Sequence, residues 1–427
     1  MPDPVSRRTF VSASLCTALT AAASTACAQQ GGSTRIFDVA DHGARGDGTT
    51  DDAAAFQRAI DAAAAAGGGV VRFGAGTFLL RLRPAEDKTG VEAITLRSRV
   101  TLQGTDRNRS ILRLADGQRG TGTYARIVSS TGSLVGAVVR DCTIDANRTG
   151  QGAFRDDGNG GALVLGLGGR CENVAVERVT IRGANGQAIM LLGAIDNLGR
   201  NLRIADCLVE RASYIGIQSS QFDGLVIERN TVTDCVDNGI DIYGNNDVTH
   251  STVATSRNGV LRGNTIRNCS IGIFLETVAD CRTIENDITD CRGAGIRVNR
   301  INGEPRNLSI LNNRITGGPV GVAMGGDTGG VTIGTNIVRG FSKAGVLFGY
   351  NVSYVTITGN QFFPAAPSVP IVLGEPIKLG RDPEEQLAFI TIRGNRVPRG
   401  HRADRMFVNR YRKEWQINAG DFRPTLG

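Results

Sequence analysis

The chain has 427 residues, with 41% hydrophobic and 21% charged residues, 57 glycines, 5% aromatic residues and a formal net charge of +7. So many glycines beside so few aromatics, with many short Val/Ile runs, are typical of short strands and turns and exclude a helical bundle. The positive charge favours an acidic partner, and we exclude nucleic acid as that partner because the sequence contains no helix-turn-helix, finger or basic–aromatic module.

Residues 1–28 are predicted to be a twin-arginine signal peptide. The pattern SRRTFV at 6–11 is followed by an Ala-rich apolar stretch and by a small-residue cleavage site at 26–28. Lipidation of Cys27 is the weaker reading, because Ser24 stands where an aliphatic residue is expected. No other stretch is apolar enough to span a bilayer. We therefore expect the mature protein to be periplasmic or secreted.

The segment GDGTTDDAAAFQRAIDAAAAAGGG, at 46–69, contains the one helix that the sequence predicts, at about 51–66. Thr50 or Asp51 is the expected N-cap and Gly67 ends the helix. Phe56, Ile60 and Ala63 fall on one face of this helix, so we expect it to cover the first coil of a solenoid.

From about residue 170 the sequence repeats itself in units such as LVIERNTVTDC, GVLRGNTIRNC and CRTIENDITDC. One asparagine marks each unit, at Asn230, Asn264, Asn286, Asn313, Asn336, Asn360 and Asn395. Units of this length with three short strands and no helix predict an all-β, single-stranded, right-handed parallel β-helix over 35–397. The irregular spacing of the asparagines places insertions at 244–258 and 364–388.

The asparagines are interpreted as structural, because Asn suits sharp turns and stacked amides can hydrogen-bond along the coils. Seven cysteines remain after removal of Cys16 and Cys27; Cys235 and Cys291 are at equivalent positions and Cys269 is one residue off. We expect these thiols to be reduced and to point inward. Residues 398–427 lose the repeat and are rich in Lys and Arg, which predicts a C-terminal cap with a basic surface.

Three blocks of the sequence resemble the pectate-lyase-like superfamily. FDVADHGARGDGTTDD opens the block at 37–80, LRSRVTLQGTDRNRSILRL stands at 96–114 and VRDCTIDANRTG at 139–150. Rhamnogalacturonase-type proteins share the first block, and mannuronan C5-epimerase catalytic modules share the order of all three. The resemblance implies a right-handed β-helix that acts on a polysaccharide. It carries over no catalytic residue, because the epimerases' Tyr-Gly-Phe-Asp-Pro-His stretch is replaced here by Gln-Ala-Ile-Met-Leu-Leu at 187–192.

Candidate site residues emerge when the units are aligned on the glycine that opens the third strand. Alternate residues of that strand then form two outward columns, and their polar groups are concentrated on the middle coils. The candidate catalytic residues are Asp241, Tyr243, Glu276, Arg297 and, on the insertion that follows, His250. The candidate substrate-binding residues are Gln218, Asn299, Arg300 and, on a loop at 145–161, Asp156 and Asp157.

These residues leave three hypotheses open. In the leading one, Arg297 neutralises a uronate carboxylate and Tyr243 or His250 removes the adjacent proton, which gives β-elimination or C5-epimerisation. In the second, Asp241 and Glu276 hydrolyse a glycosidic bond. In the third, the protein binds a glycan or serves at the surface without chemistry. The sequence indicates no cofactor and no metal site, Ca²⁺ included, and the expected partner is a polysaccharide, most simply a polyanionic one.

Overall fold

The structure is a computed structural model, and its described residues are 35–86, 90–118, 124–151, 162–194, 197–244, 256–299, 306–325, 328–349, 351–375, 386–410, 413–418 and 422–424. The predicted signal peptide at 1–28 lies outside the described residues. So do four candidate site residues: Asp156, Asp157, His250 and Arg300.

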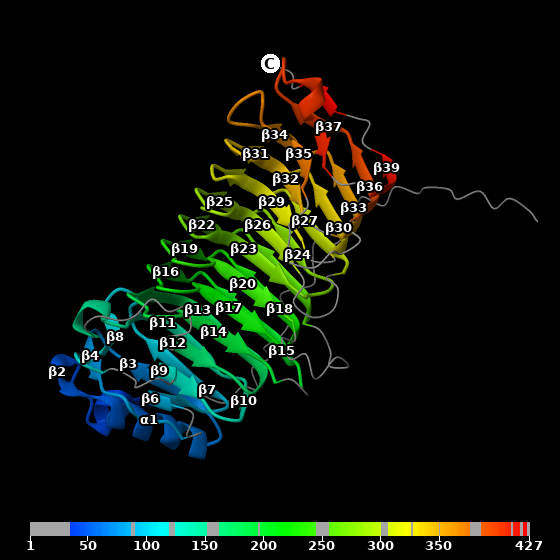
Figure 1. The fold of residues 1–427 in the computed structure, drawn as a ribbon. Helices are drawn as coiled ribbons and strands as arrows, with labels where there is room; N and C mark the ends of the chain where they lie inside the picture. Colours follow the sequence, from blue (N-terminus) through cyan, green and yellow to red (C-terminus); the bar gives the residue numbers. More distant parts are fainter. Residues whose placement is uncertain are drawn as a thin grey trace, which may run out of the picture. The chain divides into compact units, whose positions relative to one another are not determined.

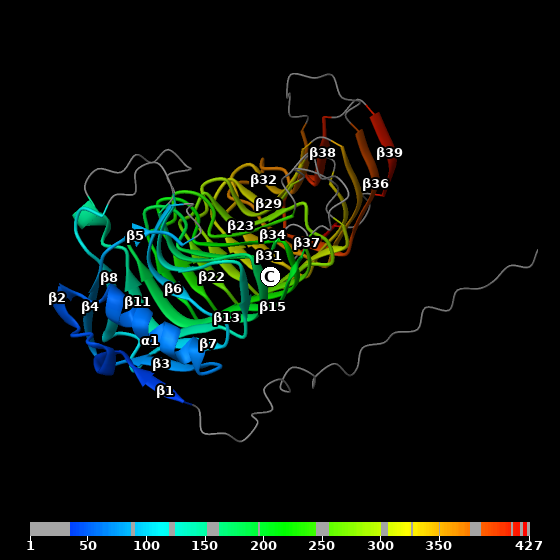
Figure 2. The ribbon, with the colours of Figure 1, turned by 90° about the horizontal axis from the view of Figure 1, so that it is seen from below.

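Residues from Arg35 onward form one unit, a stack of coils in which each coil contributes up to three strands (Figures 1 and 2). One sheet holds two strands of each coil: β1 (Ile36–Asp38), β2 (Asp47–Asp51), β3 (Gly69–Phe73), β4 (Gly76–Leu80), β7 (Val100–Gly104), β8 (Ser110–Leu114), β10 (Ser133–Val135), β11 (Val138–Asp145), β13 (Arg170–Arg182), β15 (Gly199–Ala205), β16 (Leu208–Glu210), β18 (Phe222–Glu228), β19 (Thr231–Thr233), β21 (Arg257–Arg262), β22 (Thr265–Arg267), β24 (Arg282–Ile284), β25 (Asp287–Thr289), β27 (Leu308–Leu311), β28 (Arg314–Thr316), β30 (Gly329–Gly334), β31 (Ile337–Arg339), β33 (Val352–Thr358), β34 (Gln361–Phe363), β36 (Gln386–Arg393), β37 (Asn395–Val397), β39 (Lys413–Asn418) and β40 (Phe422–Pro424).

A second sheet holds the third strand of each coil: β5 (Arg83–Pro84), β6 (Gly90–Leu96), β9 (Tyr124–Ser130), β12 (Ala162–Leu167), β14 (Ile189–Leu192), β17 (Ile217–Ser220), β20 (Ile240–Tyr243), β23 (Ile271–Glu276), β26 (Ala294–Asn299), β29 (Val320–Met324), β32 (Ala344–Phe348), β35 (Val372–Gly374) and β38 (Phe407–Asn409). Apart from β5 with β6, the described strands pair in parallel. The predicted right-handed parallel β-helix with three strands per coil is confirmed.

The helix α1 (Ala53–Ala65) covers the first coil, beside the short 3₁₀ segment η1 (Val39–His42); the other 3₁₀ segments are η2 (Arg148–Gln151) and η3 (Ala403–Arg405). Phe56, Ile60 and Ala63 are fully buried, as predicted. The N-cap is Asp52 and not Thr50 or Asp51. The Asp52 carboxylate accepts hydrogen bonds from the backbone N–H groups of Arg45 and Gly46, at 2.8 and 3.0 Å, so it ties the preceding loop to the start of the helix.

The seven repeat asparagines form a continuous buried ladder. From Asn264 onward, the side-chain oxygen of each one accepts hydrogen bonds from both the backbone N–H and the side-chain amide of the asparagine one coil earlier, at 2.9–3.0 Å. Each amide also donates to a backbone carbonyl, for example Asn286 to Leu261 at 3.1 Å. The predicted structural role of this row is confirmed, and at most 1% of each side chain is exposed.

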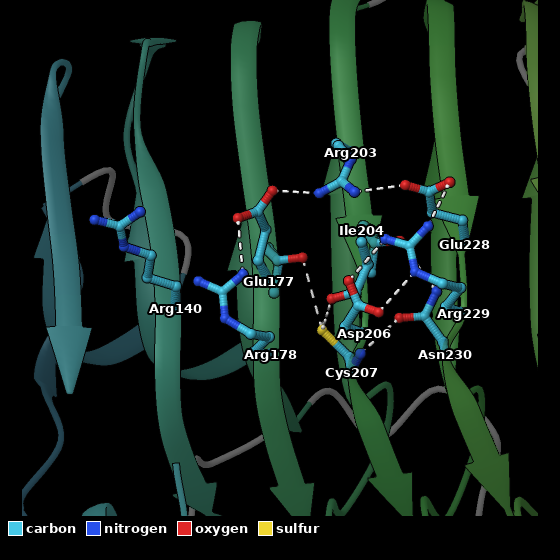
Figure 3. Close-up of polar contacts among 12 residues, drawn as sticks. Arg140, Glu177, Arg178, Arg203, Ile204, Asp206, Cys207, Glu228, Arg229 and Asn230 are labelled. Carbon is cyan, nitrogen blue, oxygen red and sulfur yellow. Dashed lines mark hydrogen bonds and ion pairs between the residues drawn. The ribbon is translucent and has the colours of Figure 1, made fainter. Parts of the chain in front are cut away.

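The position of the ladder is occupied by small apolar residues in the earlier coils. Strand pairing places Cys142, Val179 and Cys207 in register with Asn230. The Cys207 backbone N–H donates to the Asn230 side-chain oxygen at 2.9 Å, so the ladder ends on a cysteine (Figure 3).

All seven cysteines of the described chain are free and buried, as predicted. The predicted one-residue offset of Cys269 is wrong. Arg267 pairs with Thr233 and with Thr289, and each of the three cysteines follows two residues later, so Cys235, Cys269 and Cys291 form one column. The turn between Cys269 and Gly272 is one residue shorter than the turns that lead to Gly239 and Gly295, so alignment on the glycine displaced Cys269 by one position.

The glycine that opens the third strand is required by close packing and not by backbone conformation. At Gly239, a Cβ atom would lie 2.6 Å from the Ile266 side chain and 2.8 Å from the Gly272 carbonyl oxygen. Equivalent contacts surround Gly272 and Gly295. Only glycine therefore lets successive coils keep their spacing here, which is why alignment on this residue gives the correct register.

The prediction that the repeat is lost at 398–427 is wrong. β38 pairs with β35, β39 with β36 and β40 with β37, all in parallel. The tail thus adds one more coil, although it has no ladder asparagine. The alternating pattern of its strands was obscured by its charged residues.

A network of ion pairs crosses the outer face of the first sheet (Figure 3). Glu177 and Glu228 both pair with Arg203, and Glu228, whose side chain is 3% exposed, also pairs with Arg229 and Arg262 at 3.0 and 2.6 Å. Burial opposes ionisation of Glu228, but Arg262 and Arg203 hold its pKa below the usual value. Many arginines of this basic chain therefore stabilise the fold by ion pairs instead of binding a partner.

No helix among the described residues has the length and apolar character needed to cross a membrane.

Candidate active site

The candidate site lies on the second sheet, where β14, β17, β20, β23 and β26 lie side by side (Figure 1). Their register is the predicted one. Met190, Gln218, Asp241, Phe274 and Arg297 follow one another in one column, and Leu192, Ser220, Tyr243, Glu276 and Asn299 in the next.

A groove of about 550 Å³ opens over these columns. It brings together five of the predicted residues: Gln218, Asp241, Tyr243, Glu276 and Arg297. Asn299 pairs with Glu276 in the sheet but does not line the groove. The remaining lining residues are Gln187, Met190, Leu192, Tyr214, Asp237, Asn238, Ser270, Ile271 and Phe274.

Asp241 lies at the bottom of the groove, and only 5% of it is exposed. One carboxyl oxygen accepts a hydrogen bond from the Asn238 amide at 3.1 Å, and the other, Oδ1, is buried without a partner. Burial, and then the negative charge of Glu276, raise the pKa of Asp241 well above its usual range. A carboxyl held neutral in this way is a proton donor.

Glu276 is half-buried on the next strand, two residues out of register with Asp241. Burial raises its pKa to about 7, against the opposing charge of Arg297. Both protonation states of Glu276 are therefore populated near neutral pH, which is the property of an efficient general acid or base.

Two functional candidates, Tyr214 and Asp237, were missed from the sequence. Burial raises the pKa of Asp237, with Arg292 and Arg297 opposing. Burial also raises the pKa of Tyr214, and Asp237 adds to the effect. Both residues stand two positions before the aligned glycine, in the turn that leads into the strand. Extending the same alignment two residues upstream would have found them.

Arg297 is exposed at the groove, and its guanidinium lies 5.1 Å from the centre of the Phe274 ring. It forms no ion pair with any carboxylate of the described residues, although it belongs to the same groove as Asp237 and Glu276. The aromatic ring holds the cation in place while leaving it available to a ligand. No group of His, Cys, Asp and Glu among the described residues is arranged to hold a metal ion.

Residues 36–274 match the family described as rhamnogalacturonase A/epimerase, pectate-lyase-like, and residues 252–369 match a right-handed β-helix region. The chain belongs to the rhamnogalacturonase A/epimerase family. The superfamily resemblance of the N-terminal blocks is thereby confirmed.

Relatives of this family member include mannuronan C5-epimerase AlgE3 of Azotobacter vinelandii, 33% identical over 230 residues, which are 53% of this chain and 12% of that protein. Alginate lyase 7 of the same organism is 36% identical over 150 residues, 34% of this chain and 17% of that protein. The match thus spans a minor part of these longer proteins.

Solved structures share the fold of this family member. The A-module of mannuronan C5-epimerase AlgE6 of Azotobacter vinelandii superposes with a TM-score of 0.60 at 20% identity, covering 92% of this chain and all of that one. The tailspike protein of E. coli bacteriophage HK620, in complex with a pentasaccharide, superposes with a TM-score of 0.65 at 13% identity, covering 86% of this chain and 67% of that one.

Proposed function

We propose that this protein is a carbohydrate-active enzyme that removes the proton beside the carboxylate of a uronate residue in a polysaccharide. The observation that carries the proposal is the pairing, in one groove, of Glu276, whose pKa is raised to about 7, with Arg297, a cation that has no carboxylate partner among the described residues. The similarity to mannuronan C5-epimerases and to an alginate lyase supports a polyuronate as the substrate class.

The chemistry divides between these groups. Arg297 neutralises the uronate carboxylate, which acidifies the proton on the adjacent carbon. Ionised Glu276 takes that proton, a role that suits a carboxylate whose pKa is about 7. Expulsion of the substituent one carbon further on, with a proton donated by Tyr243, gives an unsaturated sugar. Return of a proton to the opposite face gives the epimer instead.

The acidic lining of the groove is compatible with an anionic ligand. Three ionised carboxylates beside one arginine would repel a uronate. Burial, however, raises the pKa of Asp237, Asp241 and Glu276 alike, so that the groove carries less negative charge than its composition indicates. A neutral Asp241 can also donate a hydrogen bond to the carboxylate that Arg297 binds.

Glycoside hydrolysis is a second candidate, favoured by the linked ionisation of Asp241 and Glu276. Their Cα atoms, one strand and two residues apart, are separated by about 8 Å, from which the carboxyl groups can reach the separations that glycosidases use. In that mechanism neutral Asp241 protonates the leaving oxygen while ionised Glu276 acts as nucleophile or activates water.

The test is incubation of the mature protein with polymannuronate, polygalacturonate and a neutral glucan. New ultraviolet-absorbing ends identify elimination, changed sugar stereochemistry at constant chain length identifies epimerisation, and reducing ends without new absorbance identify hydrolysis. Retention on a polymer column without any product identifies a binding protein and contradicts the proposal.

Two variants test the assigned roles. We expect Glu276→Gln and Arg297→Ala each to lower the rate at least about tenfold to a hundredfold. Arg339→Ala is the matched control, because Arg339 also lies over an aromatic ring, that of Phe363 at 3.9 Å, but on the other sheet. Full activity of both groove variants would place the chemistry elsewhere.

Export through the predicted twin-arginine signal would bring the protein to polysaccharides outside the cytoplasm, and this location is part of the proposal.

A further inference from the structure

One column of the coil stack has a left-handed backbone in twelve successive coils. Strand pairing aligns its members, and their φ angles lie between +50° and +126°. Glycine, asparagine and aspartate tolerate this conformation, and they fill nine of the twelve positions: Gly68, Gly136, Asn173, Asn201, Gly224, Asn258, Asp280, Asn307 and Gly330. Arg99, Tyr354 and Phe389 fill the other three.

Tyr354 and Phe389 are the exceptions that need an explanation. Their φ angles are +54° and +55°, a conformation that bulky side chains adopt only at a cost in free energy. Burial does not offset that cost, because 62% of Tyr354 and 38% of Phe389 is exposed. The two rings stack on each other with centres 4.6 Å apart and planes 7° apart.

One face of the Tyr354 ring is left open by the coil before it. The residue in register with Tyr354 on that coil is Gly330, which has no side chain to cover the ring. Phe389 covers the opposite face, and Tyr354 is the more exposed of the two residues. Arg306, exposed and without an ion pair to any described carboxylate, has its Cα atom 3.7 Å from where a Gly330 Cβ would lie.

We propose that Tyr354 and Phe389 form a second glycan-binding surface, on which one sugar ring stacks against the open face of Tyr354 at the level of Gly330. The spacing of neighbouring strands, about 4.8 Å, is also a suitable distance between a stacked sugar and an aromatic ring. The sugar thus takes the place of the missing side chain and continues the column of rings.

A sugar fits this surface better than a protein partner does. The open area is that of one ring, far below the 1,200–2,000 Å² or so that a stable protein interface buries. A repeating polymer can use so small a surface because the groove holds another part of the same chain. The choice of a glycan rests on the proposed function. Tyr354 lies in β33 of the first sheet, directly after β32, and β32 is three strands along the second sheet from β23, which carries Glu276. Only a glycan long enough to reach from the groove to this surface can therefore engage both.

Affinity electrophoresis of the mature protein through gels containing alginate, polygalacturonate or a neutral glucan tests the proposal. The variant is Tyr354→Asn, which substitutes a residue that the same column uses elsewhere. We expect retention by the bound polymer to fall about fivefold to tenfold. The melting temperature should stay constant or rise, because asparagine tolerates the left-handed conformation. A purely structural role for the rings predicts a lower melting temperature instead.

The control is Phe363→Ala, which removes an aromatic side chain from the first sheet and should leave retention unchanged. Unchanged retention of Tyr354→Asn beside a parent that binds the polymer overturns this surface and leaves the proposed function standing. A polymer that binds through Tyr354 but is never processed overturns the proposed function alone. A parent that neither binds nor processes any of the three polymers overturns both.

Discussion

Replacement of Asn286 by alanine tests the asparagine ladder at its centre. The substitution removes four hydrogen bonds: two that the Asn286 side-chain oxygen accepts from Asn264, and two that its amide donates, to Leu261 and to Asn313. The Asn264 amide keeps its bond to the Ile227 carbonyl oxygen, but the Asn264 backbone N–H is left buried without an acceptor.

The expected loss of stability follows from that count. A buried group left without a partner costs about 1–3 kcal/mol, and each of the other lost bonds contributes less because its partner retains another bond. We therefore expect the free energy of unfolding to fall by about 3 kcal/mol. With a urea dependence of about 3 kcal/mol per M or more, the unfolding midpoint should fall by roughly 0.5–1 M.

Urea unfolding followed by circular dichroism measures this shift. Native-state hydrogen exchange gives a second readout, because the backbone N–H proton of Asn264 should lose its protection from exchange. Asn108→Ala is the control: Asn108 is exposed in a turn and outside the left-handed positions, so its loss should cost less than about 0.5 kcal/mol. Equal midpoints for the two variants, with the Asn264 amide still protected, would refute the ladder as a source of stability.

Five further predictions follow from named groups. Activity that depends on ionised Glu276 should fall about tenfold per pH unit below its pKa of about 7. Burial raises that pKa, so the folded protein binds the proton more tightly than the unfolded chain does. The stability of the fold therefore decreases as the pH rises towards 7, and Glu276→Gln should stabilise the protein more at pH 8 than at pH 5. Glu228 has a lowered pKa, so its stabilising contribution is present above the pKa it has in the unfolded chain and disappears in acid. Glu228→Gln should therefore destabilise the protein at pH 7 and much less at pH 3, as thermal unfolding at the two pH values would show. A bulky thiol reagent should label few of the seven cysteines of the native protein, since burial raises the pKa of thiols such as Cys281 to about 12; rapid labelling without denaturant would contradict this. Cys207→Asn should extend the ladder by one coil and raise the unfolding midpoint, whereas a lower midpoint would show that the pocket around Cys207 is too small for an amide.

The fold was predictable from the sequence because its main constraints repeat. Each ladder asparagine and each close-packed glycine, such as Gly239, meets equivalent neighbours in its coil, so the requirement recurs once per coil even where insertions lengthen the spacing. The register of the second sheet followed directly from that glycine. That Cys142 and Cys207 occupy the ladder position in earlier coils was not predictable, because the residue type there is different.

The site was predictable only in part, because it depends on departures from the repeat. Asp241 and Glu276 stood out as polar residues on an outward column, but the sequence does not say that Asp241 is buried or that its Oδ1 has no partner. Both facts depend on how the residues around it, among them Asn238, enclose the carboxyl. Asp237 and Tyr214 lie in the turns before the aligned glycine, where side-chain direction does not alternate, so the outward columns of the strand did not include them.

Because the coils stack in register, the number of coils between two surfaces sets the distance between them. A coil duplicated between Asn313 and Asn336 would preserve the ladder and the columns and would leave the groove strands β20, β23 and β26 as they are. It would move Tyr354 away from Glu276 by one strand spacing, about 4.8 Å. The distance between the two surfaces proposed to hold the polymer can thus change only in whole steps, and the length of glycan that engages both should change with it.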